Sequence, residues 1–359
     1  MLIVKDLTKL KRAVGSVIRQ EEIVMRKIVS AVLAVILAIS VLAGCTGTKN
    51  ESKAQADKTV VKVAVLKGPT GMGMAKLIDE DASEKAANNY EFTMAASPDE
   101  ILASIIKGEF DIAAVPTNVA SILYNKTEGK VQMAAVNTLG VLYVVTTDDS
   151  VKSVADLKGR TVYSSGQGAI PEIAFNYILE KNGLTVGTDV MVEYKSEHSE
   201  IAALLASGEA QVAVLPQPFV TSVLMQNDKA KVAVDLTAEW DKLTNGESNM
   251  SMGCIVVQKA FVEAHPEAMA DFLKEYKASV EYITKAENLA DAAALIEKAD
   301  IIKAAVAQKA LPACNIVYLD GDEMIKIAGG FLQVLADANP ALVGGKLPDE
   351  GLYYKSSAK

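Results

Sequence analysis

Two stretches of this chain, one hundred residues apart, repeat the same pattern of apolar and polar positions. Residues 100–116 (EILASIIKGEFDIAAVP) and 200–216 (EIAALLASGEAQVAVLP) each predict an apolar-striped helix that ends at a glycine, then a short apolar strand and a proline. Glycine is a common residue just past the end of a helix. Two copies are too few for a solenoid, which needs at least three repeats. The repeat therefore predicts two similar α/β lobes with a ligand cleft between them.

Strand and helix patterns alternate along the chain from Val60 onward. This alternation predicts largely parallel sheets with helices on both faces. Ligands on such sheets bind beyond the carboxyl ends of the strands. We expect the chain to cross between the lobes in the polar stretch 148–159 and again near 249–253. The predicted first lobe comprises residues 59–147 and 250–359, and the second comprises residues 148–249.

The N-terminal region has the pattern of an export signal. A basic segment at 25–27 precedes an apolar run at 28–41, which is shorter than the about 20 residues of a membrane span. Cys45 follows Leu-Ala-Gly, which resembles the lipobox of bacterial lipoproteins, and this implies lipidation of Cys45, including a palmitate chain. An ordinary signal peptide or a membrane anchor is the alternative. We expect residues 1–44 to be the signal, with Met25 as the true start, and 45–58 to be a flexible tether.

The charge of the chain argues against nucleic acid as a partner. The formal net charge is −9. Without residues 1–44 there remain 29 Lys and Arg against 42 Asp and Glu, a formal charge of −13. Such a surface repels phosphate backbones. We expect a monomer whose one contact with the membrane is the lipid anchor.

The sequence offers few residues for catalysis or metal binding. His198 and His265 are the two histidines, and there is no CxxC or HExxH motif. No pair of acid and base residues stands out, so we expect no enzyme, no metal site and no cofactor. Cys254 and Cys314 follow the predicted tether, and their spacing alone does not establish whether they form a disulfide.

The loops after the predicted strands supply the candidate ligand-binding residues. Each precedes a helix whose first turn presents unpaired backbone N–H groups and a partial positive charge. Glycines let the backbone approach a ligand, and short polar side chains hydrogen-bond to it. A purely structural role, as turn or cap residues, stays open for several of them. The candidates are Thr70, Gly71, Met72, Thr117, Asn118, Asn137, Gly166, Gln167, Gly168 and Gln217.

Several of these segments together resemble one family. They are the lipobox, KGPTGMG at 67–73, the GEFDIAAVP and GEAQVAVLP pair, SVADLKGRTVYSSGQG at 153–168 and FVEAHPEAMADFLKEY at 261–276. The chain resembles the solute-binding lipoproteins of ABC importers, in the group that binds nitrate, sulfonates, taurine and thiamine-pyrimidine precursors. The resemblance implies a type II periplasmic-binding-protein fold, an extracytoplasmic location on the cell membrane, and a permease with its ATPase as partners.

The basic residues bear on the nature of the solute. Arg160 is the one arginine after the predicted signal, and it lies in a turn. Binders of sulfonate or phosphate often use a bidentate arginine. The sequence therefore favours a neutral or zwitterionic organic solute, which would include a heterocycle. The alternative is a sulfonate- or nitrate-like anion held by helix N-termini and Lys67. An exported enzyme and a sensory module are less favoured.

A few aromatic side chains could stack on a solute, although a position in the core suits each of them better. They are Tyr124, Tyr143, Tyr163 and Phe219.

Overall fold

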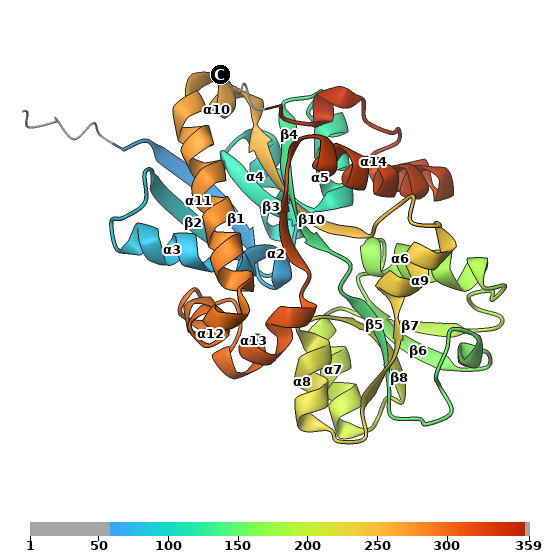
Figure 1. Cartoon of the computed structure of the whole chain (residues 1–359). Coiled ribbons are helices and arrows are strands. Elements are labelled where there is room, and N and C mark those ends of the chain that lie inside the picture. The colour runs from blue at the N-terminus through green and yellow to red at the C-terminus, as the bar shows by residue number, and fades with distance from the viewer. Residues whose placement is uncertain (1–57, 356–359) are drawn as a thin grey trace, which may run out of the picture. The chain divides into compact units, whose positions relative to one another are not determined.

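The computed structural model describes residues 58–355 and contains two β-sheets, each flanked by helices (Figure 1). The predicted export signal, Cys45 and the tether up to residue 57 lie outside the described residues. The strand order is β11-β4-β10-β3-β1-β2 in the first sheet and β7-β6-β8-β5-β9 in the second. The prediction of an α/β fold built on two sheets is confirmed.

The first sheet is parallel in one half and antiparallel in the other. β1 pairs in parallel with β2 and β3, whereas β10 runs antiparallel between β3 and β4. The apolar central strands β1, β3 and β10 are mostly buried, as expected of strands covered by helices on both faces. The strands are β1 (Val60–Leu66), β2 (Asn89–Ala95), β3 (Ile112–Pro116), β4 (Val131–Leu139), β10 (Ser251–Gln258) and β11 (Ile316–Leu319).

The second sheet repeats this plan. β6 pairs in parallel with β7 and β8, and β5 runs antiparallel between β8 and β9. Each sheet thus has a parallel core of three strands and one antiparallel neighbour at the crossing between the sheets. The strands are β5 (Leu142–Thr146), β6 (Thr161–Ser165), β7 (Met191–Lys195), β8 (Val212–Pro216) and β9 (Lys231–Asp235).

The two sequence repeats form the same unit, one in each sheet. In the first, α4 (Asp99–Lys107) leads into β3, and in the second α7 (His198–Ser207) leads into β8. Gly108 ends α4 with φ 75° and Gly208 ends α7 with φ 81°. Glycine adopts this left-handed conformation without steric cost, so both helices stop where the sequence predicts.

The first crossing between the sheets lies earlier than predicted. β4 ends at Leu139 in the first sheet, and β5 begins at Leu142 in the second. Residues 142–147 therefore belong with the second sheet, and the prediction that the chain crosses in 148–159 is wrong. That polar stretch is a loop of the second sheet, where the Arg160 guanidinium donates to Asp148 and Ser150. The chain returns to the first sheet between β9, which ends at Asp235, and β10, which begins at Ser251.

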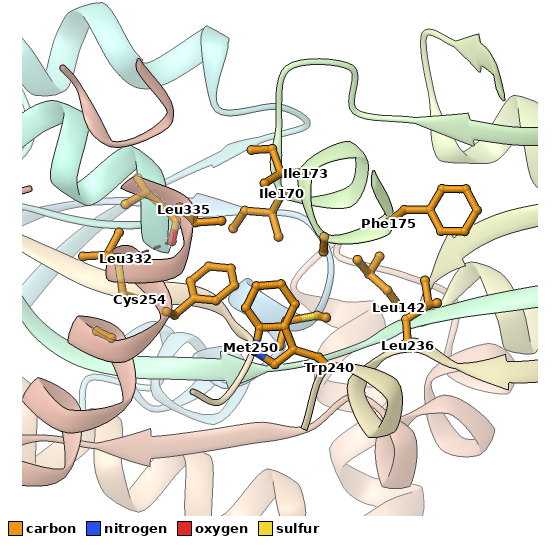
Figure 2. Close-up of a cluster of buried hydrophobic side chains, with 14 of the residues drawn as sticks. Leu142, Ile170, Ile173, Phe175, Leu236, Trp240, Met250, Cys254, Leu332 and Leu335 are labelled. Atoms are coloured by element: carbon orange, nitrogen blue, oxygen red, sulfur yellow. Dashed lines mark hydrogen bonds between the residues drawn. The ribbon is translucent and has the colours of Figure 1, made fainter. Parts of the chain in front are cut away.

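The helices cover the sheets and join them through a shared core. One hydrophobic cluster lies between the first sheet and helices α3, α11, α12 and α13. A second cluster contains residues of both sheets, and in it Trp240 of α9 lies among side chains of α6 and α14 (Figure 2). The helices are α2 (Pro69–Met72), α3 (Ala75–Ala82), α4, α5 (Thr117–Lys126), α6 (Ile170–Lys181), α7, α8 (Phe219–Gln226), α9 (Leu236–Leu243), α10 (Lys259–Ala264), α11 (Pro266–Thr284), α12 (Leu289–Lys298), α13 (Ala304–Ala310) and α14 (Gly321–Ala338).

None of the helices within residues 58–355 is long and apolar enough to cross a membrane. Cys254 and Cys314 are both buried and carry free thiols, so no disulfide joins them. Burial raises the pKa of the Cys314 thiol to about 12, which keeps it protonated at neutral pH.

Candidate functional site

A pocket of about 180 Å³ lies between the loops of the two sheets. Its volume is below the range of about 300–1,000 Å³ of drug-sized ligand sites, so it suits a small solute. The lining is mostly apolar and includes five prolines. The lining residues are Lys67, Gly68, Pro69, Thr70, Pro116, Thr138, Val141, Ala169, Ile170, Pro171, His198, Pro216, Gln217, Pro218, Phe219 and Met252.

Five helices begin at this pocket. The strands β1, β3, β6, β7 and β8 are followed by α2, α5, α6, α7 and α8, and residues at each of these junctions line the pocket. The N-cap residue of each of the five helices makes no side-chain hydrogen bond to the helix, whereas Asp235 caps α9. Backbone N–H groups and the positive ends of the helix dipoles at these helix starts therefore face the pocket.

Thr70 and Gln217 are the two predicted ligand residues that line the pocket, from opposite sides. Thr70 lies in α2, after the first strand of the first sheet. Gln217 follows β8, and its Oε1 accepts hydrogen bonds from Thr221 N at 3.3 Å and Thr221 Oγ1 at 2.8 Å. The carbonyl of Gln217 is therefore engaged in capping α8, while no described residue bonds its amide NH₂ group.

Gly71 and Met72 are buried below the pocket and are not part of its lining. A methyl group at Gly71 would lie 2.2 Å from the Leu66 carbonyl oxygen, so this glycine permits close contact of α2 with β1. Met72 is fully buried in the core of the first sheet. Both residues shape the turn that presents Thr70.

Thr117 and Asn118 are buried at the start of α5 and also lie outside the lining, although Pro116 before them is part of it. Thr117 Oγ1 is 2.9 Å from Ser251 Oγ of β10. Asn118 Nδ2 donates to the Leu342 carbonyl at 3.4 Å, in the 3₁₀ turn Pro340–Val343. Their side chains therefore bind β10 and the 3₁₀ turn Pro340–Val343.

The glycine-rich loop at 166–168 borders the pocket without lining it, and the three residues after it, 169–171, form part of the wall. Gly166 and Gly168 have φ values of 71° and 76°. Gln167 is exposed. Asn137, the remaining candidate, is buried directly before the lining residue Thr138.

His198 and Phe219 also line the pocket, although neither is among the predicted ligand residues. For His198 the sequence predicts no binding role, and for Phe219 it favours a core position over stacking on a solute. Each is the first residue of a helix that follows a parallel strand, α7 after β7 and α8 after β8. The rule that ligands bind beyond the carboxyl ends of strands applies to both. Applied to the loop after β7 as well, it would have identified His198.

The imidazole of His198 is held by a neighbouring hydroxyl. Its Nδ1 and Ser165 Oγ form a short hydrogen bond. Burial lowers the pKa of His198 to about 4, so the ring is neutral at physiological pH. A neutral imidazole carries one proton, and the hydrogen bond at Nδ1 decides which nitrogen presents a donor to the pocket.

Lys67 and Arg160, two side chains that could hold an anion, are each already paired with a carboxylate. Lys67 is the one lysine in the lining, and its Nζ lies 2.8 Å from Asp300 Oδ2. Arg160, the one arginine among the described residues, binds Asp148 in the loop after β5. Within residues 58–355 no group of three or more His, Cys, Asp or Glu side chains is arranged to hold a metal ion.

Comparisons with known proteins place this fold. Residues 77–309 match the family model of ABC transporter, phosphonate, periplasmic substrate-binding proteins. An ABC transporter protein from Parabacteroides distasonis is 27% identical, with a TM-score of 0.70 over 84% of this chain and 100% of that one. The periplasmic aliphatic sulphonate binding protein SsuA from Escherichia coli is 17% identical, with a TM-score of 0.66 over 83% and 92%.

A third solved structure is more distant. The periplasmic nitrate-binding protein NrtA from Synechocystis PCC 6803 is 14% identical, with a TM-score of 0.50 over 68% of this chain and 67% of that one. Among curated proteins, no significant sequence match is found.

Two sheets with a small pocket between the carboxyl ends of their parallel strands define a solute-binding protein of the periplasmic type. The chain belongs to the phosphonate family of ABC transporter periplasmic substrate-binding proteins. It is the component of an ABC import system that captures a small solute outside the cytoplasm and delivers it to the permease and its ATPase. Such a component is not an enzyme, which confirms that part of the prediction.

Proposed function

We propose that the protein binds a small organic solute with one compact oxyanion head, such as a sulfonate. The observation that carries the proposal is the convergence of five helix N-termini, without side-chain caps from their N-cap residues, on one small pocket. Backbone N–H groups at helix starts are ready-made anion sites. SsuA binds aliphatic sulphonates and NrtA binds nitrate, both of them oxyanions, which supports the same class here.

The charges around the pocket favour a single negative charge on the solute. Lys67 is paired with Asp300, and no arginine is present in the lining. A buried charge needs compensating partners, and a dianion needs more of them than a monoanion. The sequence alone favours a neutral or zwitterionic solute, because Arg160 is the one arginine after the predicted signal. Helix N-termini supply the missing compensation, so we now favour the anion.

His198 takes part in binding the head group. In this proposal, Ser165 Oγ–H donates to Nδ1, which leaves the proton of the neutral ring on Nε2 and makes Nε2–H a donor to the oxyanion. Thr70 and the amide NH₂ group of Gln217 are further side-chain donors in the lining. Each hydrogen bond of this kind, from a neutral donor to a charged acceptor, contributes about 1.5–3 kcal/mol.

The apolar part of the solute contacts the remaining wall. Phe219, Met252 and Ile170 belong to three different elements and are all in the lining. Methionine adapts its shape to an apolar group, and an aromatic ring offers a flat face. An alkyl or aryl group next to the oxyanion therefore fits this pocket better than an inorganic anion.

The location outside the cytoplasm follows from the family, and we propose that the chain is tethered there as a monomer through lipid on Cys45. Cys45 lies outside the described residues, so this proposal rests on the lipobox-like sequence before it. The two-lobe division of the chain, one lobe around each sheet, would allow the lobes to close on the solute.

A thermal-shift screen of the purified protein tests the proposed class. The probes are ethanesulfonate, benzenesulfonate, taurine, methylphosphonate, nitrate, uracil and an amino acid. A ligand present at 100 times its Kd stabilises the protein by about 2.7 kcal/mol, which raises the Tm measurably. We expect stabilisation by one or more organic sulfonates. Stabilisation by uracil or another neutral probe, with none by the oxyanions, would contradict the proposal.

A further inference from the structure

Asn137 is buried at the end of β4, directly behind the pocket. Its side chain is 1% exposed, and the residue is not part of the lining. The next residue, Thr138, does line the pocket. The sequence predicts that Asn137 contacts the solute, whereas in the structure its side chain lies outside the pocket lining, next to the lining residue Thr138.

The amide of Asn137 bonds to two lining residues from separate segments. Its Nδ2 donates to the Thr70 carbonyl oxygen at 3.1 Å, which lies after β1. Its Oδ1 accepts from Thr138 Oγ1 at 3.1 Å, within β4. One buried side chain therefore fixes both the turn that carries Thr70 and the rotamer of Thr138.

Gly253 of β10 completes this arrangement from the other side. A methyl group at this position would lie 2.7 Å from Asn137 Oδ1 and 2.9 Å from Thr70 Oγ1. Contacts this short are not tolerated without displacement of the atoms involved. A glycine here thus gives the amide and the Thr70 side chain the room to lie next to each other.

We propose that Asn137 is a positioning residue for solute recognition: it sets the geometry of Thr70 and Thr138, and Gly253 is needed for that geometry. The inference rests on the proposed function, because it assumes that the pocket holds the solute. A buried donor or acceptor that loses its partner is costly, so without Asn137 the Thr70 turn and the Thr138 hydroxyl reorient toward other partners. The pocket then presents different atoms to the solute.

The variant Asn137→Ala tests this role, with Asn125→Ala as the matched control. Asn125 Nδ2 also donates to backbone carbonyls, those of Val343 at 2.9 Å and Lys346 at 2.8 Å, but Asn125 is remote from the lining. With ethanesulfonate as the probe in isothermal titration, we expect Asn137→Ala to weaken binding at least tenfold and Asn125→Ala to leave Kd unchanged. Equal Kd values for Asn137→Ala and wild type would overturn the proposal.

A double-mutant cycle distinguishes positioning from a general loss of stability. Thr138→Val removes the hydroxyl that Asn137 holds, so its effect on Kd should shrink in the Asn137→Ala background. Fully additive effects would show that Asn137 does not act through Thr138. If Asn137→Ala does not fold, Gly253→Ala replaces it in the test, because this variant keeps the side-chain amide of Asn137 but displaces it. We expect the same loss of affinity for ethanesulfonate.

A solute-free crystal structure of the Asn137→Ala variant, or of Gly253→Ala, makes the test independent of the solute's identity. We expect a shifted Thr70 turn and a different Thr138 rotamer, and wild-type positions of both residues would overturn the proposal. If wild type binds no oxyanion but Thr70 and Thr138 move in the variant, the proposed function fails and the positioning role stands.

Discussion

The rings of His198 and Phe219 lie 5.4 Å apart, with 44° between their planes, on the wall that the second sheet contributes to the pocket. Each ring belongs to the first residue of its helix, α7 or α8. The pair combines a polar ring with an apolar one at the ends of two helix dipoles. This arrangement suits a solute whose charged head and apolar body lie side by side.

Stability should fall in acid partly because of His198. The folded protein keeps this ring neutral, with a pKa of about 4, whereas an unfolded chain protonates histidine near pH 6.5. The contribution is therefore fully present above about pH 6.5 and is lost as the pH falls toward 4. Chemical denaturation at pH 7, 5.5 and 4.5 should show a steeper loss for wild type than for His198→Gln. If the free energies of unfolding of wild type and His198→Gln fall equally with pH, the lowered pKa of His198 does not contribute to the loss of stability in acid.

Asp300 should limit the affinity for oxyanions. It accepts a hydrogen bond from Lys67, which lowers the Asp300 pKa and engages the one lysine of the pocket lining. Because Asp300 is 88% exposed, solvent screens the pair and we expect it to be weak. Asp300→Asn should therefore tighten sulfonate binding by up to about fivefold in low salt. This gain in affinity should vanish in the Lys67→Met background. A gain that persists there would show that Asp300 does not act through Lys67.

Trp240 should report solute binding by its fluorescence. It is the one tryptophan of the chain and is fully buried, and its Nε1 donates to the Ser248 carbonyl at 3.1 Å. Its ring centroid lies 4.8 Å from that of Tyr177 in α6 and 5.3 Å from that of Phe331 in α14. Helix α6 begins at the pocket, so closure of the two lobes should move Tyr177 relative to Phe331.

We expect a saturable change of emission on titration with ethanesulfonate and none in Trp240→Phe. Emission that stays constant while calorimetry shows binding would mean that α6 and α14 keep their relative positions.

Lipidation of Cys45 is testable by mass spectrometry of protein taken from the native membrane. The N-terminal peptide of the mature protein should begin at Cys45 and carry diacylglycerol. Cys45→Ser should yield unprocessed or released protein. An unmodified peptide that spans Ala43 to Lys49 in the mature wild type would rule out the anchor.

Local signals made much of the fold predictable. The stop at Gly108 and at Gly208 depends on the residues next to it in sequence, and both helices end there. The position of the crossing between the sheets was harder to predict, because the sequence of an apolar strand such as Leu142–Thr146 does not show which sheet the strand joins. Its partners β8 and β9 come more than sixty residues later in the chain.

For the candidate site, too, local features could be predicted from the sequence and features that depend on distant residues could not. The sequence indicates which loops end at the cleft, and Thr70 and Gln217 do line it. Which side chains at the start of a helix face the pocket depends on how the helix packs against segments that are distant in sequence. Asn118 turns toward the Leu342 carbonyl, more than two hundred residues away in sequence. Residues Phe219 and His198 reach the pocket for the same kind of reason, and neither has a distinctive local motif.

The most direct test of the proposed solute class compares two probes of nearly equal size and different charge. Isothermal titration of the purified protein with ethanesulfonate and with the uncharged ethyl methyl sulfone isolates the effect of the negative charge. If helix N-termini hold an oxyanion, ethanesulfonate should bind at least about tenfold more tightly, a difference of about 1.4 kcal/mol. Equal or tighter binding of the sulfone would contradict the account.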